Sequence, residues 1–468
     1  MPVGRSVPTV TGMRHVVTYA FLPLFLFAGS GPQAGSDDQS DGSSSDEGNT
    51  TASESTASQS SSGTLDPDSG TEGTTTPAPA CGDGIVENGT FCFRERIDLA
   101  AGGSLVASDF DSDDIAELAT GSCDQSPGFC IFEWDQSSVA LAASSTESPG
   151  EEGCGLFLLR QAAAAAPALA SCRDGTVQVH AITDGTLSVA SEAALPEGPF
   201  YVPRPVTGFD SNADGVDEII AQDYVDMDDA WDTPLLLRRD SDEWSYVGAP
   251  WPLASGNALR YPVAVGDLDG DGQDEAVLEA WTFTDAPPGH DNYDPETNQL
   301  VVMRSDGGEV SEFARFPAGT WPTAIQVADL NLDGHLDLIV RGYDRVGAAT
   351  GVGDGTFDTV SLFDLVGYEF DGEVLIRGAR AADADGDGDN ELIVVVGPSA
   401  PAFADLVIVD DPLGAATQTT LAVSFAEGNP DTDDEIVARD LSGDGVADIA
   451  VTSNLEGSHR VSILVSDP

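Results

Sequence analysis

The 468-residue chain contains no lysine, and all 18 of its basic residues are arginine. The absence of lysine excludes Schiff-base chemistry and a phosphate-binding P-loop. Acidic residues number 81, which gives a net charge of 18 − 81 = −63. A surface this acidic repels phosphate backbones, so we expect no nucleic-acid partner. The hydrophobic content of 41% is nevertheless sufficient for a folded core.

The chain also lacks the local signatures of common hydrolases, since it has no G-x-S-x-G and no H-E-x-x-H segment. Of its five histidines, His15 lies near the N-terminus and His335 lies in an acidic loop. We expect the other three, His180, His290 and His459, to be surface or turn residues. We therefore predict that the protein is not an enzyme. The alternative is a secreted hydrolase or lyase, similar to a glycosidase, that uses carboxylates on one face of the fold.

Residues 1–30 have the pattern of a cleaved signal peptide. Basic residues precede an apolar run from Val16 to Ala28, and small residues follow it. The alternative is a transmembrane anchor, but the run is shorter than the ~20 residues of a spanning helix and contains Pro23. We expect an exported protein, either secreted or at the cell surface, with the periplasm as a further location. The mature chain then has no transmembrane segment.

Residues 31–80 consist mainly of Ser, Thr, Gly, Asp and Glu. Such a composition cannot bury enough apolar surface to fold, so we predict a disordered acidic linker that acts as a spacer.

All six cysteines lie between residues 81 and 172. An even number of cysteines in an exported chain predicts disulfide bonds. Six cysteines allow 15 connectivities, and we predict sequential pairing because each pair then closes a short loop. A zinc site is the alternative, although the C-x-x-C spacing is absent. The predicted pairs are Cys81–Cys92, Cys123–Cys130 and Cys154–Cys172, and residues 81–92 form a short Cys-bounded segment of their own.

Six nine-residue segments share one pattern, with an oxygen-bearing side chain at positions 1, 3, 5 and 9. Position 6 is Gly in five segments and Asp114 in the first, as a sharp turn with positive φ requires. Calcium takes six to eight oxygen ligands, and alternate residues of a tight loop direct their side chains to one centre. The backbone carbonyl at position 7 can add a ligand. Position 12 never carries a carboxylate, which excludes a helical EF-hand loop.

Any one such loop could equally be a solvated acidic turn, but six copies in one register favour metal binding. We predict up to six structural Ca²⁺ ions whose binding free energy contributes to folding. The predicted metal ligands are Asp109, Asp111, Asp113, Ile115 and Glu117; Asp210, Asn212, Asp214, Val216 and Glu218; Asp267, Asp269, Asp271, Gln273 and Glu275; Asp329, Asn331, Asp333, His335 and Asp337; Asp383, Asp385, Asp387, Asp389 and Glu391; and Asp440, Ser442, Asp444, Val446 and Asp448.

Short β-branched segments flank the loops, so each unit contains a β-hairpin with the loop at its tip. The loop starts lie 101 (210 − 109), 57, 62, 54 and 57 residues apart. We infer that the long first gap hides a seventh unit, at 167–180, which has lost its carboxylates. Seven four-stranded units predict an all-β, seven-bladed β-propeller over residues 93–468. The last unit lacks one strand, and we expect residues 93–99 to supply it and close the ring.

These repeats resemble the FG-GAP/VCBS repeats of integrin-α-type propellers, and Gly353–Phe357 is similar to the GDGTF turn of the bacterial members. The resemblance implies calcium in the blade loops and work outside the cell in adhesion or ligand binding. We expect a monomeric, non-enzymatic module for an extracellular protein or polysaccharide. Two long segments offer weak candidates for ligand contact, the alternative being rings packed between blades. They carry Tyr224, Trp231, Trp281 and Tyr293.

Overall fold

The computed structural model describes residues 91–467 except 112, 114, 124–127, 136–137, 146–154, 162–166, 174, 184–185, 197–203, 224–232, 241–242, 248–256, 283–297, 307–308, 343, 369–373, 399–404, 422–435 and 456–457. These residues belong to one compact unit, Thr75–Pro468. The predicted signal peptide (1–30), the linker (31–80) and residues 81–90 of the Cys-bounded segment lie outside the described residues. Within the described ranges, no helix is long and apolar enough to cross a membrane.

Twenty-eight β-strands make up the described part of the chain. Sixteen of them form four antiparallel sheets of four strands each. These sheets are β14 (Asn257–Gly266), β15 (Glu275–Thr282), β16 (Gln299–Asp306) and β17 (Glu309–Pro317); β18 (Ala324–Ala328), β19 (Asp337–Arg341), β20 (Val346–Ala349) and β21 (Ser361–Phe363); β22 (Val374–Ala382), β23 (Glu391–Pro398), β24 (Asp405–Asp410) and β25 (Thr417–Leu421); and β26 (Ile436–Arg439), β27 (Asp448–Leu455) and β28 (Ser458–Ser466) with β1 (Phe93–Leu99).

The other twelve strands are connected into one sheet that consists of three antiparallel groups of four. The groups are β2 (Ala101–Ser108), β3 (Glu117–Cys123), β4 (Cys130–Asp135) and β5 (Ser138–Ser144); β6 (Phe157–Leu159), β7 (Ala168–Arg173), β8 (Thr176–Thr183) and β9 (Thr186–Ala194); and β10 (Arg204–Phe209), β11 (Glu218–Asp223), β12 (Thr233–Asp240) and β13 (Glu243–Tyr246). Only the outermost strands join them, through the single parallel pairs Ser144–Thr186 and Glu243–Ala194.

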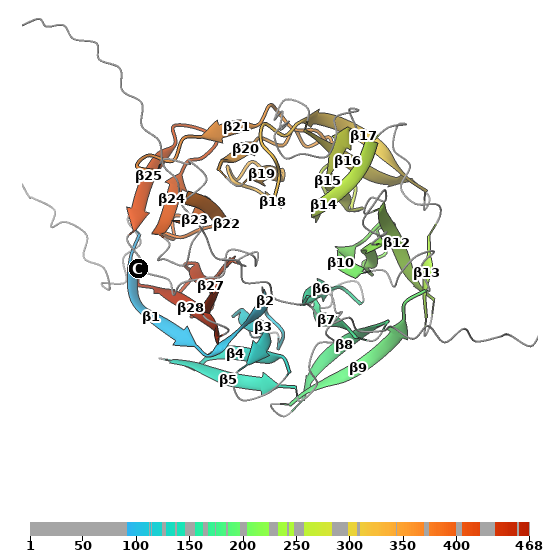
Figure 1. Ribbon diagram of the computed structural model, residues 1–468, viewed down its shortest axis with the longest axis horizontal. Helices are drawn as coiled ribbons and strands as arrows, with labels where there is room; N and C mark the ends of the chain where they lie inside the picture. Colours follow the sequence, from blue (N-terminus) through green and yellow to red (C-terminus); the bar gives the residue numbers. More distant parts are fainter. Residues whose placement is uncertain are drawn as a thin grey trace, which may run out of the picture. The chain divides into compact units, whose positions relative to one another are not determined.

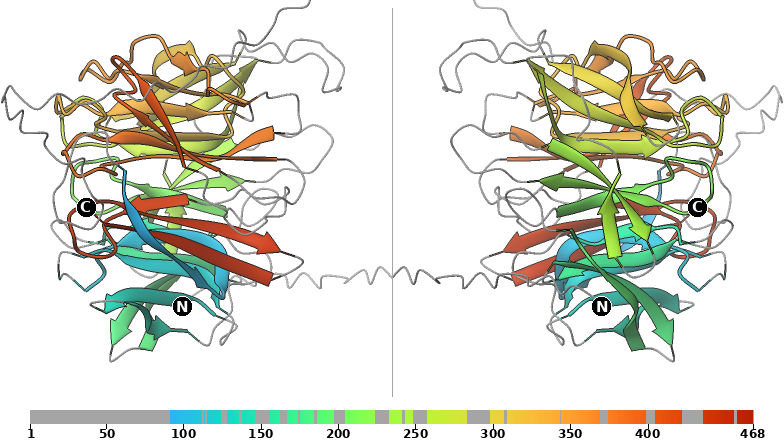
Figure 2. Two further views of the ribbon diagram at one scale, coloured as in Figure 1. Left: turned by 90° about the vertical axis from the view of Figure 1, so that its left-hand side faces the viewer. Right: turned by 90° about the vertical axis from the view of Figure 1, so that its right-hand side faces the viewer.

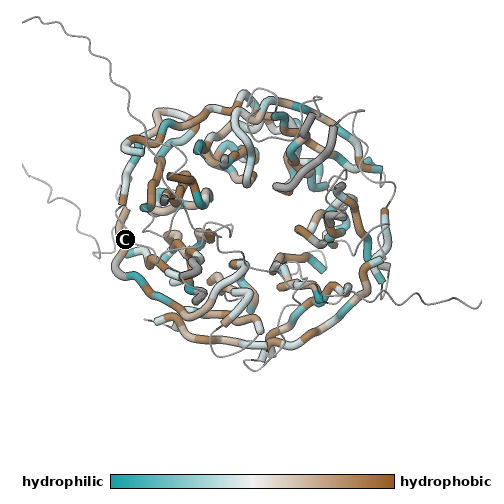
Figure 3. Tube along the Cα trace, viewed as in Figure 1, coloured by the Kyte–Doolittle hydropathy of each residue, from teal (hydrophilic) through white to brown (hydrophobic). Residues whose placement is uncertain are grey.

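The four-stranded groups follow one another around a ring, as Figure 1 shows. Each hydrophobic cluster joins two neighbouring groups; Phe157 of β6, for example, packs in one cluster with Ile219 of β11 and Trp244 of β13. The second strands of the groups are runs of Val, Ile, Leu and Ala buried on both faces, as in β19 and β23. Figure 3 shows these apolar stretches in the strands all round the ring. Radial repetition of four-stranded sheets is the β-propeller architecture.

The ring is closed by a strand from the other end of the described chain. β1 pairs with β28 in antiparallel register, with Ile97 opposite Ile463. In the left view of Figure 2 the blue strand β1 lies beside the red C-terminal strands. The prediction that residues 93–99 complete the last four-stranded sheet is therefore confirmed. Pairing of the two ends leaves no open edge at the junction.

The long gap between the first two acidic loops does contain an additional four-stranded group, β6 to β9. The predicted hairpin at 167–180 is β7 and β8, which pair in antiparallel register. In this group, however, the connection equivalent to an acidic loop is the one between β6 and β7, which begins at Arg160. The predicted position was one hairpin too late, because a strand–turn–strand pattern does not distinguish the first hairpin of a blade from the second.

One predicted disulfide lies within the described residues and is present: Cys123 is bonded to Cys130, with 6.0 Å between their Cα atoms. Cys92 and Cys172 are also disulfide-bonded. Their predicted partners, Cys81 and Cys154, lie outside the described residues.

The prediction that His180 is a surface or turn residue is wrong. The side chain is buried in β8, where its Nε2 lies 2.8 Å from Ser171 Oγ and its ring stacks edge-on against Phe129. A hydrogen-bond partner allows a histidine to be buried, and sequence alone did not reveal the partner on β7. His335 is exposed, as expected for a loop residue.

Candidate metal-binding loops

All six acidic segments connect the first and second strands of their groups. We name each loop by its first residue. In the five loops whose positions 4 and 6 the structure describes, the backbone turns twice into the left-handed region. Glycines at position 6 have φ between 76° and 99°, as predicted, and position 4 also has positive φ in five loops. At position 4 the left-handed residues are Ala213, Gly270, Leu332, Gly386 and Gly443. The repeated glycine at this position was a signal that the sequence analysis missed.

Carboxylates at positions 1 and 5 hold the loop backbone in shape. In every loop the position-5 carboxylate accepts the N–H of position 7, at 2.8–3.0 Å. In the five loops with glycine at position 6, the N–H of this glycine donates to the position-1 carboxylate at 2.8–3.0 Å. These bonds use single lone pairs, and a carboxylate has about four, so the same groups can also bind a cation.

The position-9 carboxylate fastens each loop at its other end. One of its oxygens accepts the N–H of position 2, at 2.6–3.0 Å, in all six loops. All six of these side chains are buried. The residues are Glu117, Glu218, Glu275, Asp337, Glu391 and Asp448. A buried carboxyl stays ionised at neutral pH when cations or donors face its oxygens, and otherwise its pKa rises.

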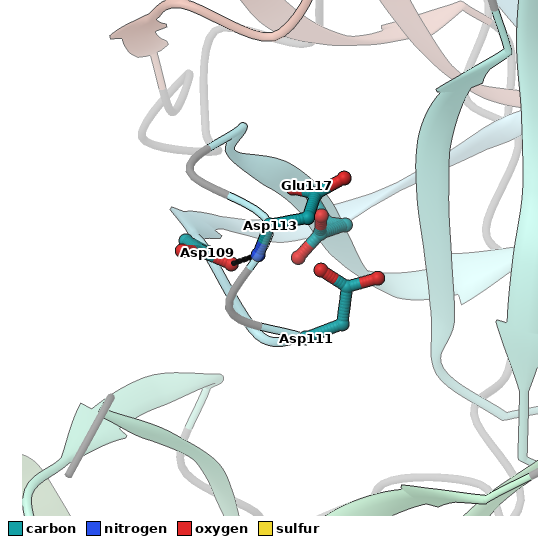
Figure 4. A group of neighbouring side chains, drawn as sticks. All are labelled: Asp109, Asp111, Asp113 and Glu117. Carbon is teal, nitrogen blue, oxygen red and sulfur yellow. Dashed lines mark hydrogen bonds between the residues drawn. The ribbon is translucent and has the colours of Figure 1, made fainter.

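The Asp109 loop gathers its four predicted carboxylates around one centre, as Figure 4 shows. Oxygen atoms of Asp109, Asp111, Asp113 and Glu117 all lie within 4.8 Å of one another. Glu117 is 2% exposed, and its Oε1 accepts no hydrogen bond from any described residue. Burial, with a smaller contribution from the three aspartates, raises the pKa of Glu117 to about 7 although the Phe110 N–H lowers it. These oxygens fit a hard cation, which would restore ionisation of Glu117.

Two other loops bring three predicted ligands equally close. The groups are Asp267, Asp269 and Asp271, and Asp383, Asp385 and Glu391. Burial raises the pKa of Glu391 to about 8 and that of Glu275 to about 7, and the neighbouring aspartates add to both shifts. Burial and the neighbouring negative charges thus favour the protonated carboxyl in both loops, and a metal ion would favour the ionised form.

The remaining loops carry Asn212, Asn331 or Ser442 at position 3, and no group of three acids this close is found in their described residues. Two of them still contain a buried ligand atom without a described hydrogen-bond partner. These atoms are Asp329 Oδ1 and Ser442 Oγ. Their predicted ligands stay predictions, as do the position-7 carbonyls.

Neighbouring loops are connected through position 8. The N–H of Asp274 donates to the carbonyl of Asp210 at 2.9 Å, and Ala447 N–H donates to Asp383 in the same way at 2.8 Å. The bond from Ala116 to Asp440, at 3.2 Å, joins the first loop to the last. In these three pairs of loops, order in one loop therefore supports its neighbour.

Arg160 takes the place of the position-1 aspartate in the group without an acidic loop. Its carbonyl accepts the N–H of Asp217 at 2.9 Å, as a position-1 carbonyl does elsewhere. Its guanidinium pairs with the Asp217 carboxylate at 2.7 Å and with the carboxylate of Asp274. Burial raises the pKa of both aspartates, although Arg160 opposes the shift. A guanidinium therefore stands where the other groups have an acidic loop.

Two further arginines enter the loops from the third strands. Arg238 of β12 contacts Glu218, and Arg304 of β16 contacts Asp269 and Glu275. Neither arginine was predicted from the sequence. They lie 20 and 29 residues after the glutamates (238 − 218 and 304 − 275), and only the strand register brings them opposite. Of the aromatic candidates, Trp281 falls at the end of β15, opposite Ala258. Tyr224, Trp231 and Tyr293 lie outside the described residues.

Comparison with known proteins gave one family match and several similar structures. Residues 329–394, which include two of the loops, match the model of the FG-GAP-like repeat. No curated protein matches the chain. Among solved structures, the chain is similar to an Agrocybe aegerita lectin whose structure concerns specific recognition of non-reducing terminal N-acetylglucosamine (14% identity, TM-score 0.45, 79% of this chain and 87% of that one). It is also similar to the periplasmic gluconolactonase of Pseudomonas aeruginosa (15% identity, TM-score 0.44, 80% of this chain and 98% of that one). A third similar structure is the Dos1 propeller (13% identity, TM-score 0.40, 77% of this chain and 77% of that one). The chain thus contains an FG-GAP-like repeat within an all-β fold of four-stranded antiparallel sheets.

Proposed function

We propose that the protein is an exported, calcium-stabilised, seven-bladed β-propeller that acts as a non-enzymatic binding or adhesion module. One observation carries the metal part of the proposal: the buried Glu117 has an oxygen, Oε1, with no described donor, and an oxygen of its carboxylate lies within 4.8 Å of oxygens of three more carboxylates. The seven-blade count is supported by the grouping of the 28 strands into sets of four, with β1 completing the last set.

Calcium is the metal that fits these loops best. Its preferred ligands are carboxylate, amide and carbonyl oxygens in a flexible shell, whereas Zn²⁺ selects nitrogen and sulfur and Mg²⁺ demands a rigid octahedron. The side chains at positions 1, 3, 5 and 9 would hold the ion. It would neutralise carboxylates that otherwise repel one another, so its binding free energy would add to the stability of the fold.

A binding role follows from what the loops can do chemically. In the described residues these carboxylates fix the loop backbone and would hold cations, so they are not available as an acid–base pair. Ser171 and His180 lie within hydrogen-bonding distance, but they are 1% and 6% exposed, so no substrate reaches them. A rigid ring that presents loops is suited to contacts with an extracellular protein or polysaccharide. Net charge of −63 suits a soluble chain in a calcium-rich exterior.

The test is a panel of surface polysaccharides and peptides, immobilised and probed with the full chain in millimolar calcium and in chelator. We expect saturable binding to at least one class in calcium and its loss in chelator. A parallel screen with general glycosidase, esterase and lactonase substrates should give no turnover. Turnover of any of these substrates, abolished by unfolding the protein, would replace the binding role with a hydrolase.

A further inference from the structure

We propose that Arg304 and Arg238 are internal counter-cations that compete with metal for the Asp267 loop and the Asp210 loop. The inference rests on the proposed function, since it states which of the predicted calcium loops bind the ion weakly. It divides six loops of similar sequence into classes that the acidic motif alone does not distinguish.

Arg304 occupies ligand atoms of the Asp267 loop. It lies on β16, next to Met303, which pairs with Ala276, so its side chain stands opposite Glu275. Its Nε lies 3.1 Å from Glu275 Oε1, and its guanidinium also contacts the Asp269 carboxylate. Those carboxylates are 0% and 14% exposed. A metal ion at the loop centre must therefore displace the guanidinium or accept its repulsion at short range.

Contacts from two sheets keep the Arg304 side chain in place. Its guanidinium carbon lies 4.1 Å from the centre of the Phe313 ring. On another side is Gly355, in the turn that precedes β21, whose N–H donates to the carbonyl of Leu268 at 3.2 Å. A side chain Cβ at 355 would lie 3.3 Å from the guanidinium nitrogen and 2.9 Å from Phe313. A guanidinium held on three sides loses little entropy on pairing, unlike an isolated surface arginine.

Arg238 does the same for the Asp210 loop. It follows Leu237, which pairs with Ile219, and its Nε lies 2.6 Å from Glu218 Oε1. The same oxygen accepts a hydrogen bond from Asn212 Nδ2 at 3.0 Å. Because position 3 is the neutral Asn212, this loop also has one carboxylate fewer than the Asp267 loop. Its closing glutamate is therefore already satisfied by groups of the chain itself.

The other two glutamate-closed loops have an acid at the same register position. The pairs Leu118–Phe132 and Leu392–Val409 place Glu133 opposite Glu117 and Asp410 opposite Glu391. Residues directly opposite one another project to the same face of a sheet. These loops thus have an acid at the register position where the Asp210 and Asp267 loops have an arginine. The Asp109 and Asp383 loops are accordingly assigned as stronger metal sites.

Direct calcium titration of the full chain tests the competition, by equilibrium dialysis or calorimetry, with wild type, Arg304→Met and Arg238→Met. Methionine keeps the apolar stem of the arginine without its charge. Each variant should bind one calcium ion about tenfold or more tightly than wild type does. The matched control is Arg315→Met, which breaks a pair with Glu312 (2.8 Å) on the outer strand β17 and should leave the titration unchanged.

The titration distinguishes failure of the arginine competition from failure of calcium binding itself. Equal titrations for wild type and both arginine variants would contradict the competition and leave calcium binding intact. Absence of calcium binding by the wild type and every variant would contradict the proposed function itself. Arg304 is the more enclosed of the two, so if Arg304→Met does not fold, Arg238→Met, whose side chain is 38% exposed, decides the matter.

Discussion

The Asp109 loop and the Asp440 loop are neighbours in the ring and share one motif, yet their closing carboxylates differ. In both, one carboxylate oxygen accepts the N–H of position 2, at 2.6 Å for Glu117 and 2.8 Å for Asp448. The other oxygen of Asp448 accepts the Ser466 N–H at 2.7 Å and the Ser466 hydroxyl at 3.0 Å. The other oxygen of Glu117 accepts nothing from the described residues.

A single methylene group accounts for this difference. The shorter Asp448 accepts from the backbone of the next strand, and Asp337 accepts the N–H of Gly351, two residues after β20, at 2.8 Å. The second oxygen of the longer glutamate contacts an arginine in Glu218 and Glu275 and accepts no described hydrogen bond in Glu117. An aspartate at position 9 thus bonds mainly to the sheet, whereas a glutamate keeps an oxygen that an arginine contacts or that a metal ion would bind under the proposed function.

The largest expected effect is that of Asp448→Ala. The change leaves the N–H groups of Leu441 and Ser466 without their acceptor in a buried place, at a cost of about 1–3 kcal/mol each. Urea unfolding should show this loss in calcium and in chelator alike. Asp448→Asn, which keeps one acceptor oxygen, should lose about half as much. A loss confined to calcium-containing buffer would contradict the distinction between the two closing residues.

Glu117→Gln, unlike Asp448→Ala, should lower the free energy of unfolding only when calcium is present. The amide removes a charge that is buried without a described counter-ion, so stability in chelator should be unchanged or higher. In calcium the variant should lose about 1–3 kcal/mol of the stabilisation that the ion gives wild type, which corresponds to about a tenfold to hundredfold weaker site. Unfolding curves at several calcium concentrations measure both effects. Equal losses with and without calcium would contradict the assignment.

Stability in chelator should depend on pH in the direction that raised carboxyl pKa values dictate. Burial raises the pKa of Asp448 to about 6, of Glu117 to about 7 and of Glu391 to about 8, above ordinary values of 3.8 and 4.5. The stability these groups contribute is present below about pH 4 and is lost as pH rises through 6 to 8. Calcium should flatten this decline by favouring the ionised form. Melting temperatures across pH 5–9 test this, and stability rising with pH in chelator would contradict it.

Position 4 should give the smallest effect. Leu332 has a φ of 54° and is 54% exposed, so Leu332→Gly relieves strain and loses little burial, and it should stabilise by about 0.5–1 kcal/mol. Gly270 has a φ of 74° with open space around its missing Cβ, so Gly270→Ala should destabilise by about 1 kcal/mol. Thermal unfolding of the two variants measures both. The same sign for both changes would contradict a backbone origin.

Structural features that depend on a local sequence motif were predictable. Contacts that depend on the register between distant strands were not. The acidic repeat located the six loops, and the strand missing from the last unit located β1. The connection at Arg160 was misplaced, because its alanine-rich sequence carries none of the acids that identify the other loops. Arg238 and Arg304 reach their loops only through pairing with strands far away in sequence. His180 was misjudged for the same reason, since its partner Ser171 lies on the adjacent strand.

The most direct test of the central claim, that metal in these loops stabilises the fold, is thermal unfolding of the full chain in millimolar calcium and in chelator. We predict that the melting temperature rises with calcium concentration. The rise should follow the logarithm of the calcium concentration, because the ion binds the folded state and not the unfolded chain. Magnesium at the same concentration should have a smaller effect, because it demands a stricter geometry. An unchanged melting temperature would contradict the account, and the loops would then be acidic turns.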